Sequence, residues 1–280
     1  MAVQTARGDG EEVLDSSALQ QFRVRGFVAV PGFFSGREVE AMRLDIERLK
    51  VIGRLRNVAT EGDGETPATD MENLQLCPMY RDSDLFRALP FHPKVVAAIS
   101  TLIGDPFFLH LDQVFLKPGG QGVGTHWHQD NAYFKIGDPM RGTAMWIAIH
   151  DATVANGTMR VIDGSFREAY DHYRDPYSDH HIRCDPPEER AVTVELPAGG
   201  VLFFCYGTAH STGDNQTEQE RAGVAFHFLH ADYATGDLLA DDRDYRPYLS
   251  GPRATGGQQE YGVRVEGTWE NEVGRALQPA

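Results

Sequence analysis

Cysteine is scarce in this chain of 280 residues, which contains three cysteines, at Cys77, Cys184 and Cys205. An odd number at such wide spacing excludes a disulfide framework and a Cys-x-x-Cys metal knuckle. Long apolar runs are lacking too, since no segment approaches the roughly 18 apolar residues that a membrane helix needs. The first residues, MAVQTARGDGEE, carry no apolar segment of the kind that a secretory signal contains. We therefore expect a cytoplasmic protein with reduced thiols.

Basic residues are outnumbered by acidic ones, with 26 Lys and Arg against 41 Asp and Glu and a net charge of −15. Nucleic acids and anionic membranes bind surfaces that concentrate Lys and Arg. We therefore expect no nucleic-acid partner and no membrane partner, and a small molecule as the substrate. The chain is 41% hydrophobic and 10% aromatic, which is enough to bury a sizeable core. The composition leaves the oligomeric state open.

The first hundred residues carry helical signals. A helical pattern begins near Ser17, and residues 27–30 (FVAV) predict a short strand. Ser35 followed by Glu38 has the form of a capping box, which predicts that a helix begins there. Residues 92–103 (HPKVVAAISTLI) predict a further helix. These helices would lie against whatever core the rest of the chain forms.

After Pro106 the apolar segments become short and rich in β-formers, and Gly, Pro, Asn and Asp separate them. Such a pattern predicts a sandwich or barrel of strands, so the chain is mainly β with flanking helices. Residues 54–72 and the tail after residue 236 are expected to be loop-like. We expect one domain, in which residues 1–14 are disordered, 15–105 form a helical N-terminal support, 106–232 form the β core with an insertion at 165–189 that resembles a functional loop, and 233–280 form a C-terminal extension.

Iron sites in non-haem oxygenases use two His and one carboxylate on one side of the metal. Residues i and i+2 of a strand point the same way, so His-x-Asp on a strand can aim two ligands at one ion. About one such pair is expected by chance, and the chain has three: His110/Asp112, His128/Asp130 and His230/Asp232. No His follows His230, and His110 lies in an apolar strand where a buried structural pair is the simpler interpretation. His128 follows the flexible run PGGQGVG, where a strand can begin at the mouth of a sandwich.

The downstream sequence favours the pair at His128. VLFFCYGTAH brings His210 to the end of an apolar strand, and Thr212 has the same parity. We expect the run GDNQTEQE to form a hairpin turn that makes Thr212 and Arg221 neighbours. Arg221 would share its face with Gly223 and Ala225, which leave room for a small molecule, and a buried guanidinium there needs a carboxylate. The opposite face of that strand is expected to pack into the core through Val224, Phe226 and Phe228.

The segments THWHQDNAYF, GTAMWIAIHDATVANGTMRVIDGSF and GTAHSTGDNQTEQERAGVAFHF together resemble the phytanoyl-CoA dioxygenase family. The resemblance covers roughly residues 16–232 and is sharpest over 110–228. It implies a double-stranded β-helix (jelly-roll or cupin-like) core. It also implies an oxygenase that uses Fe(II), with 2-oxoglutarate as co-substrate and O₂ as oxidant.

The same resemblance implies which residues do the chemistry. The iron ligands, which form the catalytic centre, would be His128, Asp130 and His210. The residues around 2-oxoglutarate would be Arg221, Thr212, Trp146, Gln113 and Lys117. Lys117 also fits a solvated charge at a strand end, His110 a structural role, and Asn131 and Tyr133 either the substrate side or ordinary packing. The carboxylate of Asp130 favours oxygenation over halogenation, because halogenating relatives carry a small residue at that position.

These expectations define a dioxygenase that hydroxylates or oxidatively cyclises a small polar or cationic natural product and releases succinate and CO₂. Aminoglycosides and amino-acid derivatives fit the acidic chain, and family members that tailor antibiotics fit such a role. A phytanoyl-CoA-like acyl hydroxylase is an alternative, although the phosphates of coenzyme A favour a basic patch. A non-catalytic cupin-like protein that binds a metal or small molecule is a second alternative, and a zinc hydrolase is a third.

Overall fold

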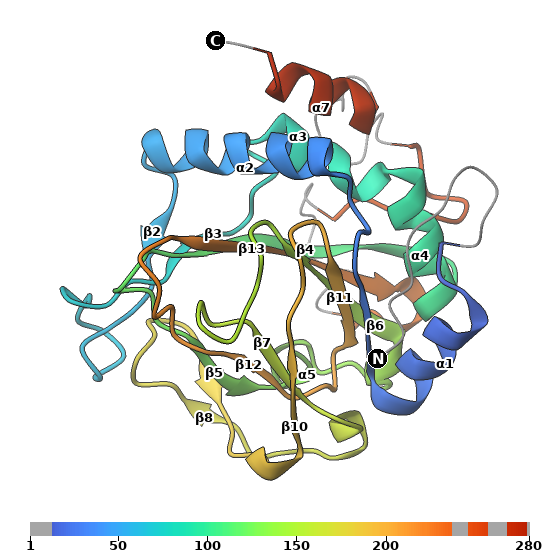
Figure 1. The fold of residues 1–280 in the computed structure, drawn as a ribbon. Coiled ribbons are helices and arrows are strands. Elements are labelled where there is room, and N and C mark those ends of the chain that lie inside the picture. The colour runs from blue at the N-terminus through green and yellow to red at the C-terminus, as the bar shows by residue number, and fades with distance from the viewer. Residues whose placement is uncertain (1–12, 237–245, 257–267, 279–280) are drawn as a thin grey trace.

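Two antiparallel β-sheets form the centre of the computed structural model, which describes residues 13–236, 246–256 and 268–278. The larger sheet runs in the order β1 (Phe27–Val30), β11 (Val201–Cys205), β6 (Gly142–Ala148), β13 (Arg221–His230), β4 (Phe107–Lys117), β3 (Leu74–Leu76) and β2 (Arg56–Asn57). The smaller sheet runs in the order β10 (Ala191–Val194), β7 (Met159–Ile162), β12 (His210–Thr212) and β5 (Thr125–His128). The two sheets face each other in Figure 1. The predicted fold, mainly β around a double-stranded β-helix, is confirmed.

Helices cover the face of the larger sheet that points away from the smaller one (Figure 1). They are α1 (Ser16–Arg25), α2 (Gly36–Val51), α3 (Asp84–Ala88), α4 (Pro93–Ile103) and α7 (Trp269–Ala276), and a short α5 (Asn131–Phe134) follows β5. The predicted capping box is present at the start of α2. The side chain of Glu38 accepts a hydrogen bond from the backbone N–H of Ser35 at 2.7 Å, and Ser35 Oγ accepts one from the N–H of Glu38. No helix in the described residues is both long and apolar enough to cross a membrane.

Three parts of the expected organisation need correction. The N-terminal support contains two strands beyond the predicted one at residues 27–30, because β2 and β3 also join the larger sheet, and β2 lies inside the expected loop 54–72. The insertion 165–189 contains its own two-stranded sheet, β8 (Tyr173–Arg174) with β9 (Ile182–Arg183). The tail contains the helix α7, whose Trp269 is buried and donates to Glu38 Oε1 at 2.6 Å. The expected disorder at the N-terminus falls almost wholly on residues outside the described range.

Strand β13 shows how the core is divided. Its alternate residues Val224, Phe226 and Phe228 are fully buried in the apolar cluster shared with the helices. The residues between them point to the other side of the sheet, because successive side chains of a strand point to opposite faces. Arg221, Ala225 and other side chains of that face line a pocket between the two sheets. The predicted packing face of this strand is thus confirmed.

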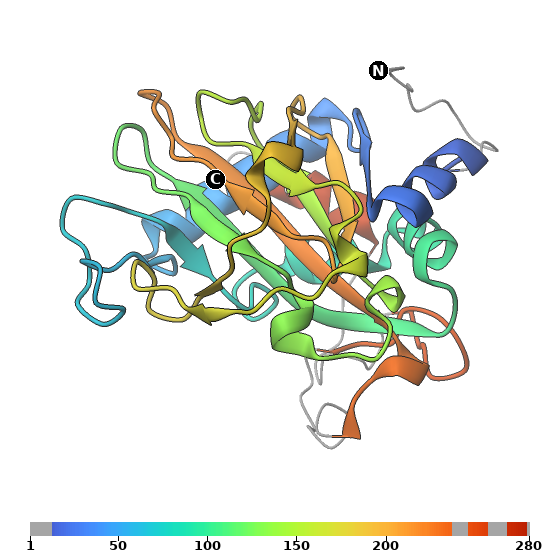
Figure 2. The ribbon, with the colours of Figure 1, turned by 90° about the horizontal axis from the view of Figure 1, so that it is seen from below.

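The two regions expected to be loops lie together at one edge of the sandwich. Figure 2 shows the segment near residue 60 beside the segment near residue 175. Thr60 Oγ1 donates to the backbone oxygen of Pro176 at 2.7 Å, and the N–H of Thr60 donates to that of Tyr177 at 3.1 Å. Backbone and side chain together therefore fix one loop against the other.

Candidate metal centre and co-substrate pocket

Two imidazoles and one carboxylate meet between the sheets. His128, Asp130 and His210 are all buried, and one ligand atom from each lies within 4.8 Å of the others. Asp130 Oδ1 is 3.8 Å from the Nε2 atom of His128 and 3.8 Å from that of His210. In the described residues this is the one cluster of three His, Cys, Asp or Glu side chains that could hold a metal ion.

Strand pairing brings the two imidazoles together. His128 in β5 is the direct cross-strand partner of His210 in β12, and their ring centroids are 4.2 Å apart. The carboxylate of Asp130 is not placed by the strand alternation that we expected. Strand β5 ends at His128, and Asp130 has helical backbone angles at the start of α5. The chain therefore turns toward the metal site after the strand, and the parity of His-x-Asp is not what aligns these two ligands.

The donor set suits a divalent metal such as iron. The Nδ1 atoms of His128 and His210 lie 2.8 and 2.9 Å from the backbone oxygens of His126 and Thr208. A carbonyl oxygen can only accept a hydrogen bond, so each Nδ1 carries the hydrogen and each Nε2 keeps its lone pair for a metal. Burial lowers the pKa of His128 to about 3 and also lowers that of His210, so both rings are neutral. Two neutral imidazoles and one carboxylate form the ligand set of non-haem iron oxygenases.

His227 also belongs to this site, although it was not among the predicted residues. Its Nε2 atom lies 3.2 Å from Asp130 Oδ2, the oxygen that does not face the two other ligands. Burial opposes the charge on Asp130, but His210 and His227 outweigh that effect and lower its pKa. A signal was available, because residue 227 has the same strand parity as Arg221 and Ala225.

Two cations are buried at the inner end of the pocket. Arg221 and Lys117 are cross-strand partners in β13 and β4, and each is 1% exposed. Lys117 Nζ donates to Thr212 Oγ1 at 2.7 Å and to the backbone oxygen of Gly213 at 2.5 Å, and Arg221 donates to the backbone oxygen of Gly157. No carboxylate of the described residues forms an ion pair with either side chain. Burial lowers the pKa of Lys117 well below its ordinary value and that of Arg221 to about 10.

The other residues expected around the co-substrate line the same pocket. Trp146, Gln113 and Thr212 are all among its lining residues. The guanidinium of Arg221 lies 5.7 Å from the centre of the Trp146 ring.

The expected hairpin between Thr212 and Arg221 is wrong. Strand β12 belongs to the smaller sheet and β13 to the larger one, so these two residues approach the pocket from opposite sheets.

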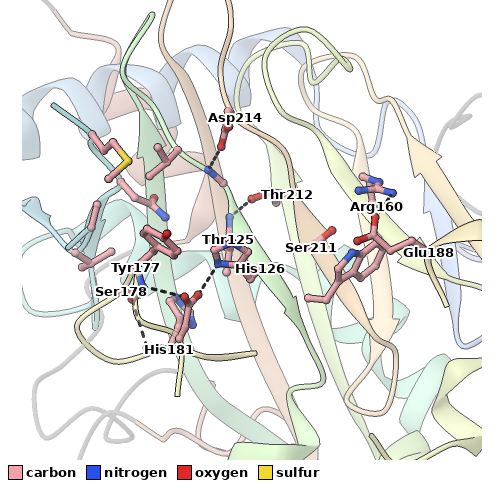
Figure 3. Close-up of a pocket in the computed structure, with 18 residues that line it drawn as sticks. Thr125, His126, Arg160, Tyr177, Ser178, His181, Glu188, Ser211, Thr212 and Asp214 are labelled. Carbon is pink, nitrogen blue, oxygen red and sulfur yellow. Dashed lines mark hydrogen bonds and ion pairs between the residues drawn. The ribbon is translucent and has the colours of Figure 1, made fainter. Parts of the chain in front are cut away.

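A second, larger cavity adjoins this pocket. It has a volume of about 330 Å³ and shares four lining residues with the inner pocket: Thr125, His181, Ser211 and Thr212. Its remaining walls include side chains from both loop regions and three carboxylates, Asp175, Glu188 and Asp214. Figure 3 shows Arg160 and Glu188 on one side of the cavity and Tyr177 and His181 on the other. Arg160 forms an ion pair with Glu188 at 2.9 Å, so these two charges offset each other. The carboxylates of Asp175 and Asp214 then leave the lining with a net negative charge.

The structure shows hydrogen-bond partners for His110, Asn131 and Tyr133, whose roles the sequence left open. His110 Nδ1 lies 3.1 Å from the hydroxyl of Tyr206 in a buried contact. Asn131 bonds the backbone N–H and carbonyl of Ile136, which closes the turn after α5. The hydroxyl of Tyr133 lies 3.1 Å from His181 Nδ1 and accepts a hydrogen bond from the N–H of Ile182 at 2.9 Å. His110 and Asn131 thus serve packing and loop closure, whereas Tyr133 contacts a residue that lines both cavities.

The jelly roll and its buried His, Asp and His define the class of the protein as a non-haem metal-dependent oxygenase. The chain belongs to the phytanoyl-CoA dioxygenase family, whose model matches residues 22–223. The predicted enzyme class, a dioxygenase that depends on iron and 2-oxoglutarate, is thereby confirmed.

Individual relatives agree with this membership. An ectoine dioxygenase of Halomonas elongata is 25% identical over 269 residues, which cover 87% of this chain and 76% of that protein. The solved structure of SnoK, described as a non-heme alpha ketoglutarate dependent carbocyclase from nogalamycin biosynthesis, has a TM-score of 0.70 and 21% identity. That match covers 87% of this chain and all of that chain. The epimerase SnoN, solved with Fe3+, alpha ketoglutarate and nogalamycin RO, has a TM-score of 0.66 and 25% identity over 85% of this chain and 96% of its own.

Proposed function

We propose that this protein oxidises a small polar or cationic natural product, by hydroxylation or oxidative cyclisation, and converts 2-oxoglutarate and O₂ to succinate and CO₂. The single observation that carries the proposal is the pair of buried cations, Arg221 and Lys117, beside the cluster of His128, Asp130 and His210. Buried cations are costly unless an anion pairs with them. A dicarboxylate co-substrate supplies that anion next to the candidate metal ligands.

Each group has a defined task in this proposal. His128, Asp130 and His210 would hold Fe(II), while His227 fixes the second carboxylate oxygen of Asp130. The bound iron, with 2-oxoglutarate and O₂, supplies the oxidising power that amino-acid side chains lack.

The chain positions the co-substrate. Arg221 binds the carboxylate far from the metal, and the guanidinium offers two parallel N–H donors for it. Lys117 adds a second charge and holds the hydroxyl of Thr212 in place. Trp146 and Gln113 form further walls of the pocket, and a bound co-substrate would displace water from the reacting groups.

The substrate class rests on the outer cavity and on the relatives. Three carboxylates and one paired Arg line the cavity, and the whole chain carries a charge of −15, so a cation is attracted and an anion is repelled. The Halomonas elongata relative is named for ectoine, and SnoN was solved with nogalamycin RO. Both names refer to a small molecule, which supports a small-molecule substrate here. An aminoglycoside or an amino-acid derivative fits this lining better than an acyl-CoA, whose phosphates add negative charge.

Anaerobic binding of Fe(II) and 2-oxoglutarate tests the ligand assignment. We expect the visible charge-transfer band of such a complex in the wild type and its loss in His210→Ala. His180→Ala, which changes an exposed histidine, is the matched control and should keep the band. A band that persists in His210→Ala would overturn the assignment, and activity restored by Zn(II) alone would favour a hydrolase.

A panel of ectoine, kanamycin and phytanoyl-CoA tests the substrate class. Succinate release and the mass of the organic product are measured for each compound. We expect stimulation by a polar or cationic member, with a KM that rises with salt concentration. Stimulation by phytanoyl-CoA alone would favour the acyl hydroxylase instead.

A further inference from the structure

His181 has a buried nitrogen without a partner. The residue is 9% exposed, and its Nε2 atom makes no hydrogen bond in the described part of the chain. An unpaired buried polar atom is costly in free energy, which makes it a candidate to bind a polar atom of a ligand. The ring lies 5.6 Å from that of His128 and 5.9 Å from that of Phe115, measured between centroids.

The position of His181 is the boundary between the two cavities. It is one of four residues that line both the inner pocket and the outer cavity. The other three, Thr125, Ser211 and Thr212, have short side chains. The ring of His181 therefore lies where the two cavities adjoin.

The second ring nitrogen decides which atom carries the proton. The hydroxyl oxygen of Tyr133 accepts the N–H of Ile182, so its own proton is available for His181 Nδ1 at 3.1 Å. Burial raises the pKa of Tyr133 to about 12, so the hydroxyl keeps this proton, and burial lowers the pKa of His181, so its ring is neutral. A neutral imidazole that accepts at Nδ1 carries its hydrogen at Nε2.

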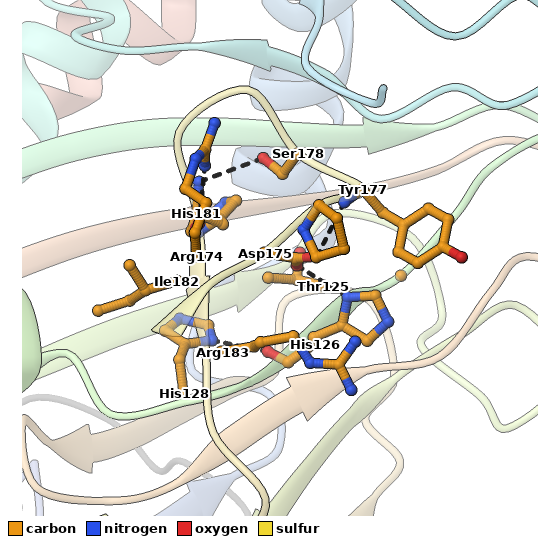
Figure 4. A network of polar contacts seen from close by, with 12 residues as sticks. Thr125, His126, His128, Arg174, Asp175, Tyr177, Ser178, His181, Ile182 and Arg183 are labelled. Carbon is orange, nitrogen blue, oxygen red and sulfur yellow. Dashed lines mark hydrogen bonds and ion pairs between the residues drawn. The ribbon is translucent and has the colours of Figure 1, made fainter. Parts of the chain in front are cut away.

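The backbone holds this ring in place before any ligand arrives. The N–H of His181 donates to Ser178 Oγ at 3.3 Å, and its carbonyl accepts from the N–H of Asp175 at 3.0 Å and from Arg174 Nη1 at 2.8 Å (Figure 4). Asp175 in turn bonds His126 in β5 at 2.8 Å. A donor that is fixed in advance loses little entropy when it binds.

We propose that His181 is a substrate-binding residue whose Nε2–H donates a hydrogen bond to an uncharged oxygen of the substrate, close to the carbon that is oxidised. The substrate class is then a compound with a hydroxyl, ether or carbonyl oxygen at or next to the reacting carbon. Tyr133 is a positioning residue that sets the tautomer of His181. This inference rests on the proposed function, because it takes the neighbouring His128 as an iron ligand.

Nuclear magnetic resonance of ¹⁵N-histidine-labelled protein, loaded with Zn(II) and 2-oxoglutarate, tests the tautomer without a substrate. The resonances of His181 are assigned from their absence in His181→Phe and, independently, in His181→Gln. We expect the proton on Nε2 in the wild type and a mixture of tautomers in Tyr133→Phe. A proton on Nδ1 in the wild type would overturn the proposal.

Kinetics on the panel of ectoine, kanamycin and phytanoyl-CoA test the contact itself, with the compound that stimulates the wild type most. We expect His181→Phe to raise its KM at least tenfold and to lower the product formed per succinate. His181→Gln, which can place an N–H near the same point, should stay within about threefold. An unchanged KM and product ratio in His181→Phe would sink the assignment.

The Fe(II)–2-oxoglutarate band of the same wild-type preparation distinguishes failure of the proposed function from failure of the proposed role of His181. A wild type without the band overturns the proposed function. A wild type with the band, together with an unchanged His181→Phe, overturns only the role of His181. Should no compound of the panel stimulate the wild type, the proposed substrate class is wrong and the tautomer measurement alone decides the role of His181.

Discussion

The two faces of strand β13 differ in every property that matters for function. Toward the helices it presents Val224, Phe226 and Phe228, all fully buried among apolar side chains. Toward the smaller sheet it presents Arg221, which is buried without a carboxylate partner in the described residues, and His227, which bonds Asp130. One face stabilises the fold, whereas the other carries a cost in free energy that a ligand offsets. The comparison predicts that substitutions on the two faces separate stability from activity.

The largest effect is expected on the helix side. Phe226→Ala removes a fully buried ring and should lower the free energy of unfolding by about 3–5 kcal/mol. Denaturant unfolding measures the loss, and succinate formation per folded molecule at low temperature should stay near that of the wild type. A large fall in kcat of the folded variant would show that the two faces are not separate.

The next effect is expected on the opposite side, at Arg221→Met. Loss of a buried partner for a carboxylate typically costs about 2–5 kcal/mol, so the KM for 2-oxoglutarate should rise at least about 30-fold. 2-Oxoglutarate should raise the Tm of the wild type, and this rise should be absent in the variant. Arg48→Met, which changes an Arg paired with Asp45 on α2, is the control and should leave both quantities unchanged. Wild-type affinity in Arg221→Met would refute the role of the guanidinium.

A smaller effect concerns Asp112, an acid on the apolar side of the sheet. Asp112 is the cross-strand partner of Phe226 and accepts the N–H groups of Met79 and Tyr80 at 2.9 and 3.1 Å. Burial raises its pKa from 3.8 to about 7 despite these hydrogen bonds. Between these two values the folded state binds more protons than the unfolded state, so stability falls as pH rises toward 7.

Asp112→Asn should therefore remove part of this pH dependence. Between pH 5 and pH 8 the free energy of unfolding of the wild type should fall by about 1–3 kcal/mol more than that of the variant. Denaturant titrations at both pH values measure the difference. Equal pH slopes in the two proteins would contradict the raised pKa.

The smallest effect sharpens the comparison on the pocket side. A Cβ at Gly223 would lie 2.6 Å from Nε1 of Trp146, so Gly223→Ala must displace the indole that lines the pocket. Overpacking of this kind costs about 1–3 kcal/mol, and we expect the KM for 2-oxoglutarate to rise about tenfold. Gly36→Ala, where a Cβ meets nothing within 4 Å, should leave the KM unchanged. A KM for Gly223→Ala equal to that of the wild type would show that the indole can move freely.

Local patterns account for what was predicted correctly. The capping box at Ser35 and Glu38 depends on atoms three residues apart, and the alternation along β13 depends on the pleat of a single strand. The same alternation places His227 on the face of Arg221 and Ala225, so His227 was predictable as a residue of this pocket. The resemblance to a known family added the pairing of His128 with His210, which lie 82 positions apart.

The incorrect and missing predictions concern contacts between segments that are far apart in the sequence. The run after Thr212 crosses between sheets instead of forming a hairpin, because β12 finds its partners in β5 and β7. Asp130 reaches the metal site through the turn into α5 rather than through strand parity. His181 lies in a polar loop without any period, so no pattern marked it.

The amino-acid sequence by itself determined which side chains share a face, where the helices begin and which chemistry the His, Asp and Arg side chains can perform. These properties depend on neighbours a few residues away. Only the tertiary structure decided that Lys117 and Arg221 are buried together and that His181 stands between two cavities. Burial and unpaired hydrogen-bonding atoms arise when distant segments pack, so they exist only in the folded chain.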